Sequence, residues 1–450
     1  MKDSPYVSTT NACKLCTPLG ASMVFKGIKG CVPFLHGSQG CATYMRRYII
    51  SHYREPMDIA SSALGEKQAV FGGGPNLKKG ILNVMKKYDP EVIGVATTCL
   101  TETIGDDVAR ILWEFQKEFG DLDLPPLVHA STPSYSGTHM EGWRSAVKAI
   151  CDQLVMEKAP ERDAVNVMPG FVSSADMRHL KDIVEDFGLT PILVPDLSET
   201  LDGPALYDYE NIPSGGTSLS DIRSMSGARG TLEFGRIMAT ASTGGQGLES
   251  RFGVKNHAIG LPIGLRESDA MFAALSGMSG EPMPRRHAMD RGRLVDAYVD
   301  GHKYVFGKRA VVYGEEDLVI GLVSFLAEIG VTPILAATGG KSNRFKDEIA
   351  KVCDILPEVP ETRQGVDFFD IAEEAQGMAP DLLVGHSKGY RYAKAWNVPL
   401  VRVGFPIHDR FGGQRTLHLG YRGAQELFDR IVNAVLERNQ TVSPVGYGYL

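Results

Sequence analysis

Two stretches with one shared pattern decide the fold: EDFGLTPILV at Glu185–Val194 and AEIGVTPILA at Ala327–Ala336. In each, an amphipathic helical pattern runs into a glycine, and a short apolar run follows. Glycine at such a position ends a helix, because it adopts the left-handed conformation without steric cost. Continuous apolar runs are typical of parallel strands that helices cover on both faces. The two stretches therefore predict repeated helix–strand units of an α/β protein.

The same alternation continues along the chain of 450 residues. We interpret the following apolar runs as parallel strands: Glu91–Ala96, Pro125–His129, Val165–Met168, Pro191–Val194, Arg309–Tyr313, Pro333–Ala336, Asp381–Val384 and Pro399–Val403. Helical patterns lie at Ser174–Phe187, Glu316–Ile329 and Arg422–Glu437. We expect a long loop at Asp202–Ser220 and an interruption, interpreted as a linker, at Gly277–Arg293. A chain of this length exceeds one hydrophobic core, so two or more doubly wound domains are expected.

The composition is that of an ordinary globular protein, with 43% hydrophobic and 22% charged residues. A formal net charge of −7 speaks against the basic surface that a nucleic-acid partner requires. The opening residues lack the apolar segment of a signal peptide, and no run approaches the ~18 apolar residues of a membrane span. We therefore expect a cytoplasmic protein without membrane association. Clustered cysteines in that compartment indicate metal or redox ligands before disulfides.

Three of the seven cysteines stand in turn-like surroundings near the start of the chain. Cys16 precedes Thr-Pro-Leu-Gly, Cys41 closes His-Gly-Ser-Gln-Gly, and Cys99 follows an apolar run that ends in Ala-Thr-Thr. Turns leave backbone N–H groups available to the sulfurs of an iron–sulfur cluster, and glycines let the backbone come close to it. We therefore predict that Cys16, Cys41 and Cys99 hold part of such a cluster.

The remaining cysteines have different expected roles. Cys31, Cys151 and Cys353 lie in apolar or helical patterns and are expected to be buried structural residues. Cys13 and Cys16 form a Cys-x-x-Cys pair, but zinc would need a second pair, and a dithiol redox pair should stand between a strand and a helix. Three thiolates are also an incomplete set, because a four-iron cubane usually takes four. Either Cys13 or a partner chain supplies the rest.

Other polar residues near these motifs have structural explanations. Lone histidines are usually hydrogen-bonded structural residues, as we expect for His36, His52, His129 and His139. Glu102, Asp106 and Asp107 would suit a carboxylate metal site, but Asp106 and Asp107 are expected to open a helix, where negative charge is favourable. His386 and Lys388 follow a predicted strand and lie on a functional face without a specific assignment.

At these loops the sequence resembles the β-type subunits of the nitrogenase family. The segments that carry the resemblance are CTPLGA at Cys16–Ala21, HGSQGC at His36–Cys41, HYREP at His52–Pro56, AVFGGGPNL at Ala69–Leu77, TTCLTETIGDDV at Thr97–Val108, TPSYSGTHMEGW at Thr132–Trp143 and RVGFPIHDRFGGQR at Arg402–Arg415. They follow one another in order over most of the chain. HGSQGC together with the TTC and IGDD motifs is highly specific.

The resemblance implies three Rossmann-like α/β domains with mostly parallel sheets, of the nitrogenase component 1 type. We expect an N-terminal cluster-binding domain at 1–160, a second domain at 161–300, and a third at 301–450 that ends in a helix. It also implies an α2β2 heterotetramer. A P-cluster-type 8Fe-7S centre would be shared with the α-type subunit, with a 4Fe-4S cluster as the alternative.

For the site, the resemblance implies that Cys16, Cys41 and Cys99 are the β-side cluster ligands. Ser134 matches the serine that binds a cluster iron in the oxidised state. The catalytic iron–sulfur–carbide cofactor belongs to the α-type partner, so no catalytic residue is assigned in this chain. Electrons would come from an ATP-hydrolysing homodimeric iron protein. This chain has no ATP-binding motif of its own, because GGKSNRF at Gly339–Phe345 lacks the Gly-x4-Gly-Lys-Ser/Thr frame.

Three functions within the family stay open. The chain is a subunit of a nitrogenase-like reductase such as a methylthio-alkane reductase, the β-type half of the scaffold on which the iron–molybdenum cofactor matures, or the β subunit of a dinitrogen reductase. The C-terminal segment from Gly404 looks nearer to scaffold chains of anaerobes. The short stretch before Cys16 and the full set of three cysteines with Ser134 favour the nitrogenase-like reductase.

Overall fold

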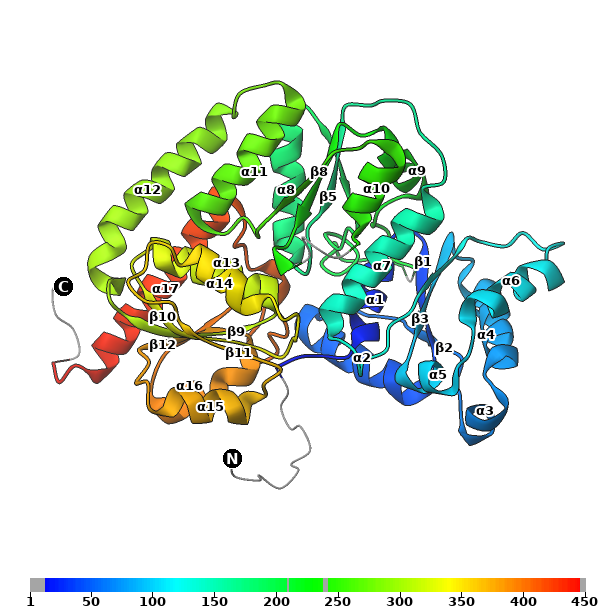
Figure 1. The fold of residues 1–450 in the computed structure, drawn as a ribbon, viewed down its shortest axis with the longest axis horizontal. Coiled ribbons are helices and arrows are strands. Elements are labelled where there is room, and N and C mark those ends of the chain that lie inside the picture. The colour runs from blue at the N-terminus through cyan, green and yellow to red at the C-terminus, as the bar shows by residue number, and fades with distance from the viewer. Residues whose placement is uncertain (1–12, 209, 238–241, 446–450) are drawn as a thin grey trace.

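The computed structural model describes residues 13–208, 210–237 and 242–445. Its strands form three separate sheets, and every strand pair in them is parallel. The three sheets lie in three lobes, with helices packed on their faces (Figure 1). No helix in the described part of the chain is both long enough and apolar enough to cross a membrane.

The first sheet has the strand order β2-β1-β3-β4. Its strands are β1 (Cys31–His36), β2 (Ala60–Ser61), β3 (Val92–Thr97) and β4 (Leu127–Ala130). The helices of this unit are α1 (Thr17–Lys26), α2 (Gln39–Tyr53), α3 (Glu66–Phe71), α4 (Gly74–Tyr88), α5 (Cys99–Ile104), α6 (Val108–Glu118) and α7 (His139–Leu154). Helices α1 and α7 cover one face, and α4 and α6 cover the other (Figure 1). Every residue of β1 and of β3 is buried, as expected of strands in a parallel sheet that helices cover on both faces.

The second sheet has the order β6-β5-β7-β8. Its strands are β5 (Ala164–Met168), β6 (Thr190–Leu193), β7 (Gly230–Phe234) and β8 (Asn256–Ile259). The accompanying helices are α8 (Ser174–Asp186), α9 (Leu219–Ser224), α10 (Gly244–Phe252) and α11 (Gly264–Ser279). Helix α10 also packs against α7, so this unit rests on the first one.

The third sheet has the order β11-β10-β9-β12-β13. Its strands are β9 (Arg309–Gly314), β10 (Thr332–Thr338), β11 (Glu361–Gln364), β12 (Leu382–Gly385) and β13 (Leu400–Arg402). Helices α13 (Glu316–Glu328) and α14 (Phe345–Val352) lie on one face, and α15 (Phe368–Gln376) and α16 (Tyr390–Trp396) on the other (Figure 1). The long helices α12 (Arg285–Val305) and α17 (Gly420–Val442) pack side by side.

The predicted fold class is confirmed, and each of the predicted strands is present within two residues of its expected bounds. The two helix–glycine–strand stretches end their helices at Gly188 and Gly330, which adopt φ angles of 73° and 77°. The linker predicted at Gly277–Arg293 is wrong. Helix α11 runs to Ser279 and α12 begins at Arg285. The residues from the left-handed Gly280 to Pro284 form only a short turn between these two helices. Each sheet falls within one of the ranges predicted for the domains, whose exact bounds stay a prediction.

Candidate functional site

Three of the four predicted site residues follow strands that end at one edge of the first sheet. In the parallel register, His36 of β1 lies opposite Thr97 of β3. Cys41 is the third residue of α2, which follows β1, and Cys99 is the first residue of α5, which follows β3. Ser134 lies in the loop after β4. Ligand sites in open α/β sheets form at this edge, because the carboxyl ends of parallel strands meet there.

Cys16 reaches the same place from another direction, because it is the N-cap of α1. Helix α1 crosses α7 at very close range: a Cβ atom added to Gly20 would lie 1.7 Å from the carbonyl oxygen of His139. A Cβ atom added to Gly142 would lie 1.8 Å from the carbonyl oxygen of Thr17. Only glycine allows two backbones to approach so closely. This crossing sets the position of Cys16.

Ser134 lies between Cys16 and Cys99. Its backbone N–H donates to the Sγ atom of Cys99 at 3.3 Å, and its hydroxyl oxygen accepts the backbone N–H of Thr17 at 3.1 Å. Burial raises the pKa of the Cys16 thiol, a hydrogen bond with Ser134 opposes the rise, and the like charges of Cys41 and Cys99 add to it. The three sulfurs therefore lie in one electrostatic neighbourhood, where a positively charged metal centre favours the thiolate forms.

The donor set fits an iron–sulfur cluster better than a single ion. All three cysteines stand at the first turn of a helix, where backbone N–H groups lack intrahelical partners and favour negative charge. Within the described residues, no three His, Cys, Asp or Glu side chains are close enough to hold one metal ion. Sulfurs spaced this way suit a polynuclear group whose different irons bind different cysteines.

The site is open on one side. Cys16 and Cys41 are half-buried, whereas Cys99 is exposed. The exposed aromatic side chains nearest in sequence are Tyr44, three residues after Cys41, and Tyr135, next to Ser134, with 46% and 68% of their surface accessible. The described residues therefore leave these cysteines at an open surface and do not enclose them. No pattern in the sequence indicates these two tyrosines, because exposure depends on the tertiary packing.

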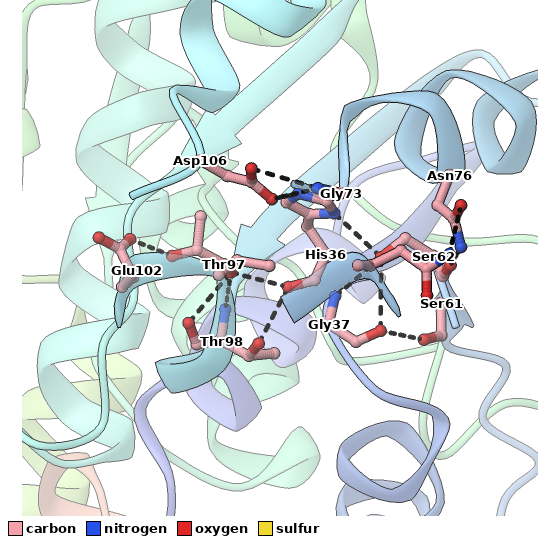
Figure 2. Close-up of polar contacts among 12 residues, drawn as sticks. His36, Gly37, Ser61, Ser62, Gly73, Asn76, Thr97, Thr98, Glu102 and Asp106 are labelled. Atoms are coloured by element: carbon pink, nitrogen blue, oxygen red, sulfur yellow. Dashed lines mark hydrogen bonds and ion pairs between the residues drawn. The ribbon is translucent and has the colours of Figure 1, made fainter. Parts of the chain in front are cut away.

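Hydrogen bonds lock the two cysteine loops together (Figure 2). The hydroxyls of Thr98 and Thr101 both donate to the backbone oxygen of His36 at 3.0 Å. Thr97 donates its hydroxyl to Glu102 at 2.5 Å and accepts the backbone N–H of Thr132 at 2.7 Å, which ties β4 to β3. The carboxylate of Glu102 therefore serves neighbouring hydroxyl groups and has a structural explanation.

A chain of polar side chains continues behind these loops. His36 Nδ1 lies 2.9 Å from the Ser62 hydroxyl, and His36 Nε2 lies 3.0 Å from Asp106 Oδ2. These distances are those of a hydrolase Ser–His–Asp triad, but His36 and Ser62 are only 0% and 4% exposed and are closed to a substrate. Asp107 caps α6 by accepting the N–H of Arg110, as predicted. The same expectation for Asp106 is wrong, because its carboxylate binds His36 and Gly73 instead.

Cys13 lies apart from the other cluster candidates, at the edge of the third sheet. Its sulfur is 3.8 Å from His386 Nε2 and accepts hydrogen bonds from the backbone N–H groups of Gly314 and Gly339. Burial raises the pKa of this thiol to about 12, so it is uncharged at neutral pH. Lys388 also lies near this point: burial lowers its pKa, and the charges of Tyr48, Cys13 and Cys16 oppose that shift.

The other sequence predictions have the following outcomes. Cys31, Cys151 and Cys353 are buried, as predicted. His36, His52 and His139 are buried as well, and His52 Nδ1 accepts the backbone N–H of Ile407 at 2.8 Å. The hydrogen bonds expected of the other two histidines are not found in the described part of the chain: His129 Nε2 and His139 Nδ1 are buried without a partner. Neither the place of Lys388 near Cys16 nor the link from Asp106 to Gly73 follows from any spacing in the sequence.

Comparison with known proteins gives matches along almost the whole chain. Residues 16–436 match the family model described as nitrogenase component 1 type oxidoreductase. The nitrogenase molybdenum-iron protein beta chain of Clostridium pasteurianum is 34% identical over 429 residues, which cover 95% of this chain and 93% of that protein. The nitrogenase iron-molybdenum cofactor biosynthesis protein NifN of Bradyrhizobium diazoefficiens is 33% identical over 431 residues, covering 95% and 89%.

A solved structure is similar as well. The structure titled nitrogenase Cp1 at pH 6.5 superposes with a TM-score of 0.95 at 32% sequence identity and covers all of this chain and 98% of its own. A second chain, in the structure titled nitrogenase Cp1 at pH 5, has a TM-score of 0.70 at 16% identity and shares the fold alone.

Proposed function

Because the chain belongs to the nitrogenase component 1 type oxidoreductase family as a β-type member, we propose that it is the β-type subunit of a nitrogenase-like reductase. In this proposal it holds half of a P-cluster-type 8Fe-7S centre at the boundary with an α-type subunit. The observation that carries the proposal is the meeting of Cys16, Cys41, Cys99 and Ser134 at one open edge of the first sheet.

Each of these residues has a defined task. The thiolates of Cys16, Cys41 and Cys99 would hold the cluster irons, and the helix N-termini beneath them would stabilise its negative charge. The N–H of Ser134 already donates to Cys99, and its hydroxyl is the oxygen ligand available for an oxidised centre. The cluster, when bound, supplies electron transfer. The chain's own residues position it, donate hydrogen bonds to it and leave one side open.

The open side is where we place the α-type subunit of an α2β2 heterotetramer. Exposed Tyr44, Cys99 and Tyr135 would be covered by that partner, which completes the ligand set. Cys13 is engaged by the third sheet, which supports the partner chain as the source of further ligands. The catalytic iron–sulfur–carbide cofactor would lie in the α-type subunit, and the complex would work in the cytoplasm, where the thiols stay reduced.

A second surface suits the ATP-hydrolysing homodimeric iron protein. Val70 and Phe71 are consecutive apolar residues at the end of α3, with 76% and 80% of their surface accessible. Helix α3 contacts α5, which begins with Cys99, so this apolar corner lies close to the cluster edge. Exposed neighbouring apolar side chains of this kind mark protein interaction sites.

The second candidate function is the scaffold for the iron–molybdenum cofactor, with a 4Fe-4S cluster in place of the larger centre. The similar identities to a beta chain, 34%, and to NifN, 33%, keep this candidate in view. A third is the β subunit of a dinitrogen reductase. The complete set of three cysteines with Ser134 favours the eight-iron centre and hence a reductase. Methylthio-alkanes are the substrate class we favour.

Iron analysis of the purified complex separates the first two candidates. The chain would be purified anaerobically with its α-type subunit, lacking the catalytic cofactor, and its iron counted. About eight irons per αβ interface would support the reductase, and about four the scaffold. A Cys41→Ala variant that keeps its colour and assembly would contradict cluster binding altogether. With the iron protein and loaded cofactor, acetylene, dinitrogen and dimethyl sulfide would then be compared, and no reduction of any would favour the scaffold.

A further inference from the structure

The exposed apolar corner is tied to the interior by one carboxylate. After Phe71 the chain turns through Gly72, at a φ angle of 86°, and Gly73 caps the N-terminus of α4. The backbone N–H of Gly73 donates to both oxygens of Asp106, at 3.2 and 2.9 Å. A Cβ atom at Gly73 would lie 2.7 Å from the His36 ring and 2.8 Å from Asp106, so the contact is closely packed.

The carboxylate of Asp106 that binds Gly73 also contacts the ring of His36. An ionised carboxylate only accepts hydrogen bonds, so His36 Nε2 carries the proton that it donates to Asp106. His36 Nδ1 is then an acceptor and takes the hydroxyl proton of Ser62, whose oxygen accepts the backbone N–H of Gly37 at 2.9 Å. With this tautomer, the Gly37 N–H, the Ser62 hydroxyl and His36 Nε2 each donate one step closer to Asp106, and Figure 2 shows these contacts. Such one-directional chains strengthen their members.

His36 and Gly37 lead directly to both cysteine loops. The backbone oxygen of His36 accepts the hydroxyls of Thr98 and Thr101, at the start of the helix that begins with Cys99. Gly37 begins the turn into α2, which carries Cys41. A Cβ atom at Gly37 would lie 2.3 Å from the Thr98 hydroxyl oxygen, so the two loops are in contact.

We propose that Asp106 is a positioning residue that fixes the Cys41 and Cys99 loops relative to the exposed Val70–Phe71 corner. A protein that binds this corner would thereby act on the loops of the cluster through the Gly73–Asp106–His36 contacts. This inference rests on the proposed function for its partner and its cluster. The link itself is a property of the protein contacts and is testable without metal.

Hydrogen exchange of the αβ complex, followed by mass spectrometry, tests the link. We expect Asp106→Ala to speed exchange about tenfold at residues 36–41 and 98–104, because local opening then leaves fewer buried hydrogen bonds to break. Asp106→Asn should restore much of the protection, since an amide accepts from Gly73 and donates to His36 once the imidazole changes tautomer. The matched control is Asp107→Ala, which removes the cap of α6 and should leave both loops unchanged.

Three results would overturn the inference. Faster exchange confined to the start of α4 would make Asp106 a local cap only. Equal effects of Asp107→Ala on the loops would make the response general. The iron protein could also slow exchange at the Val70–Phe71 corner of the unaltered complex without slowing it at the two cysteine loops. That result would contradict coupling between the corner and the loops. If Asp106→Ala does not fold, Ser62→Ala replaces it in the test. This variant removes the hydroxyl that joins His36 to the backbone N–H of Gly37, and it leaves the hydrogen bond between Gly73 and Asp106 in place.

The same preparations separate this inference from the proposed function. An unaltered complex that assembles without iron would contradict cluster binding, while its exchange pattern would still decide the role of Asp106. If the complex holds its full iron content and Asp106→Ala leaves the exchange of both loops unchanged, the role of Asp106 is contradicted and cluster binding is not.

Discussion

The carboxyl edges of the first and third sheets carry similar residues, but the cysteine is exposed at the first and buried at the third. At both, parallel strands end beside a cysteine, a histidine and glycine-rich turns. Cys13 at the third sheet accepts N–H groups from Gly314 and Gly339 and lies near His386, yet it is buried and its thiol pKa is raised. Cys99 at the first sheet accepts one N–H, from Ser134, and is exposed.

Under the proposed function, the difference teaches that access, more than motif, would decide which cysteine binds a cluster. A thiol enclosed by protein stays protonated, because burial penalises the charged form. A thiol at an open edge can lose its proton to a metal and leaves room for a partner's ligands. Cys13-x-x-Cys16 is a single motif in the sequence, but its two sulfurs belong to these two different environments.

Replacing the cysteines one at a time is the most direct test of this contrast between the two sheet edges. Cys41→Ala should remove most of the iron and the brown colour of the αβ complex, because an interface cluster loses one of its ligands. Cys13→Ala is the matched control and should keep the iron content of the unaltered complex. Iron analysis and visible absorption measure both. Equal loss of iron in the two variants would show that Cys13 is a cluster ligand.

Thiol reactivity sharpens the comparison in the metal-free chain. We expect iodoacetamide to modify Cys99 at least about a hundredfold faster than Cys13, since only the thiolate reacts and burial both hides Cys13 and raises its pKa to about 12. Peptide mass spectrometry after timed labelling measures the two rates. Buried Cys151 serves as an internal slow control. Comparable rates for Cys13 and Cys99 would contradict the enclosed environment of Cys13.

Sequence patterns predicted the layers of the fold well and its site only partly. The apolar runs at Val165–Met168 and Arg309–Tyr313 are buried parallel strands, because a strand covered on both faces leaves a local signature. The strands β1, β2, β7, β8 and β11 were not predicted, since short or partly polar runs show themselves as strands only through their neighbours in the sheet. Gly277–Arg293 was misread because methionine, proline and arginine there belong to helix ends.

The site shows the same limit. Motifs in the sequence pointed to Cys16, Cys41, Cys99 and Ser134, and the structure brings these four residues to one edge. The separate place of Cys13 is a tertiary fact, as are the exposure of Tyr135 and the second contact of Asp106. A pair of neighbouring aspartates in a sequence gives no sign that one caps a helix while the other joins two loops.

The helix crossing behind Cys16 tests whether packing sets the position of the open edge. Gly20→Ala forces a methyl group against the carbonyl of His139, and we expect it to cost at least about 2–3 kcal/mol, as overpacking does. Gly277→Ala is the matched control: it adds a methyl group with nothing within 4 Å in α11 and should stabilise by about 0.5–1 kcal/mol. Thermal unfolding of both variants gives the comparison. A harmless Gly20→Ala would contradict the close crossing of α1 and α7.

Acidification tests the enclosed histidine behind the same crossing, with the smallest expected effect. Burial lowers the pKa of His139 to about 4, so the folded chain keeps this imidazole neutral below pH 6.5 while the unfolded chain protonates it. The stabilising difference is present in full above the unfolded pKa and is lost as the pH falls through the folded pKa. At pH 5.5 this one group should lower the free energy of unfolding by about 1 kcal/mol relative to pH 7.5. His139→Gln should reduce the fall in melting temperature between these two pH values. An unaltered pH dependence in His139→Gln would mean that the imidazole takes up its proton at the same pH in the folded and the unfolded chain. The contrast between a closed interior and the open edge of the first sheet would then fail at this residue.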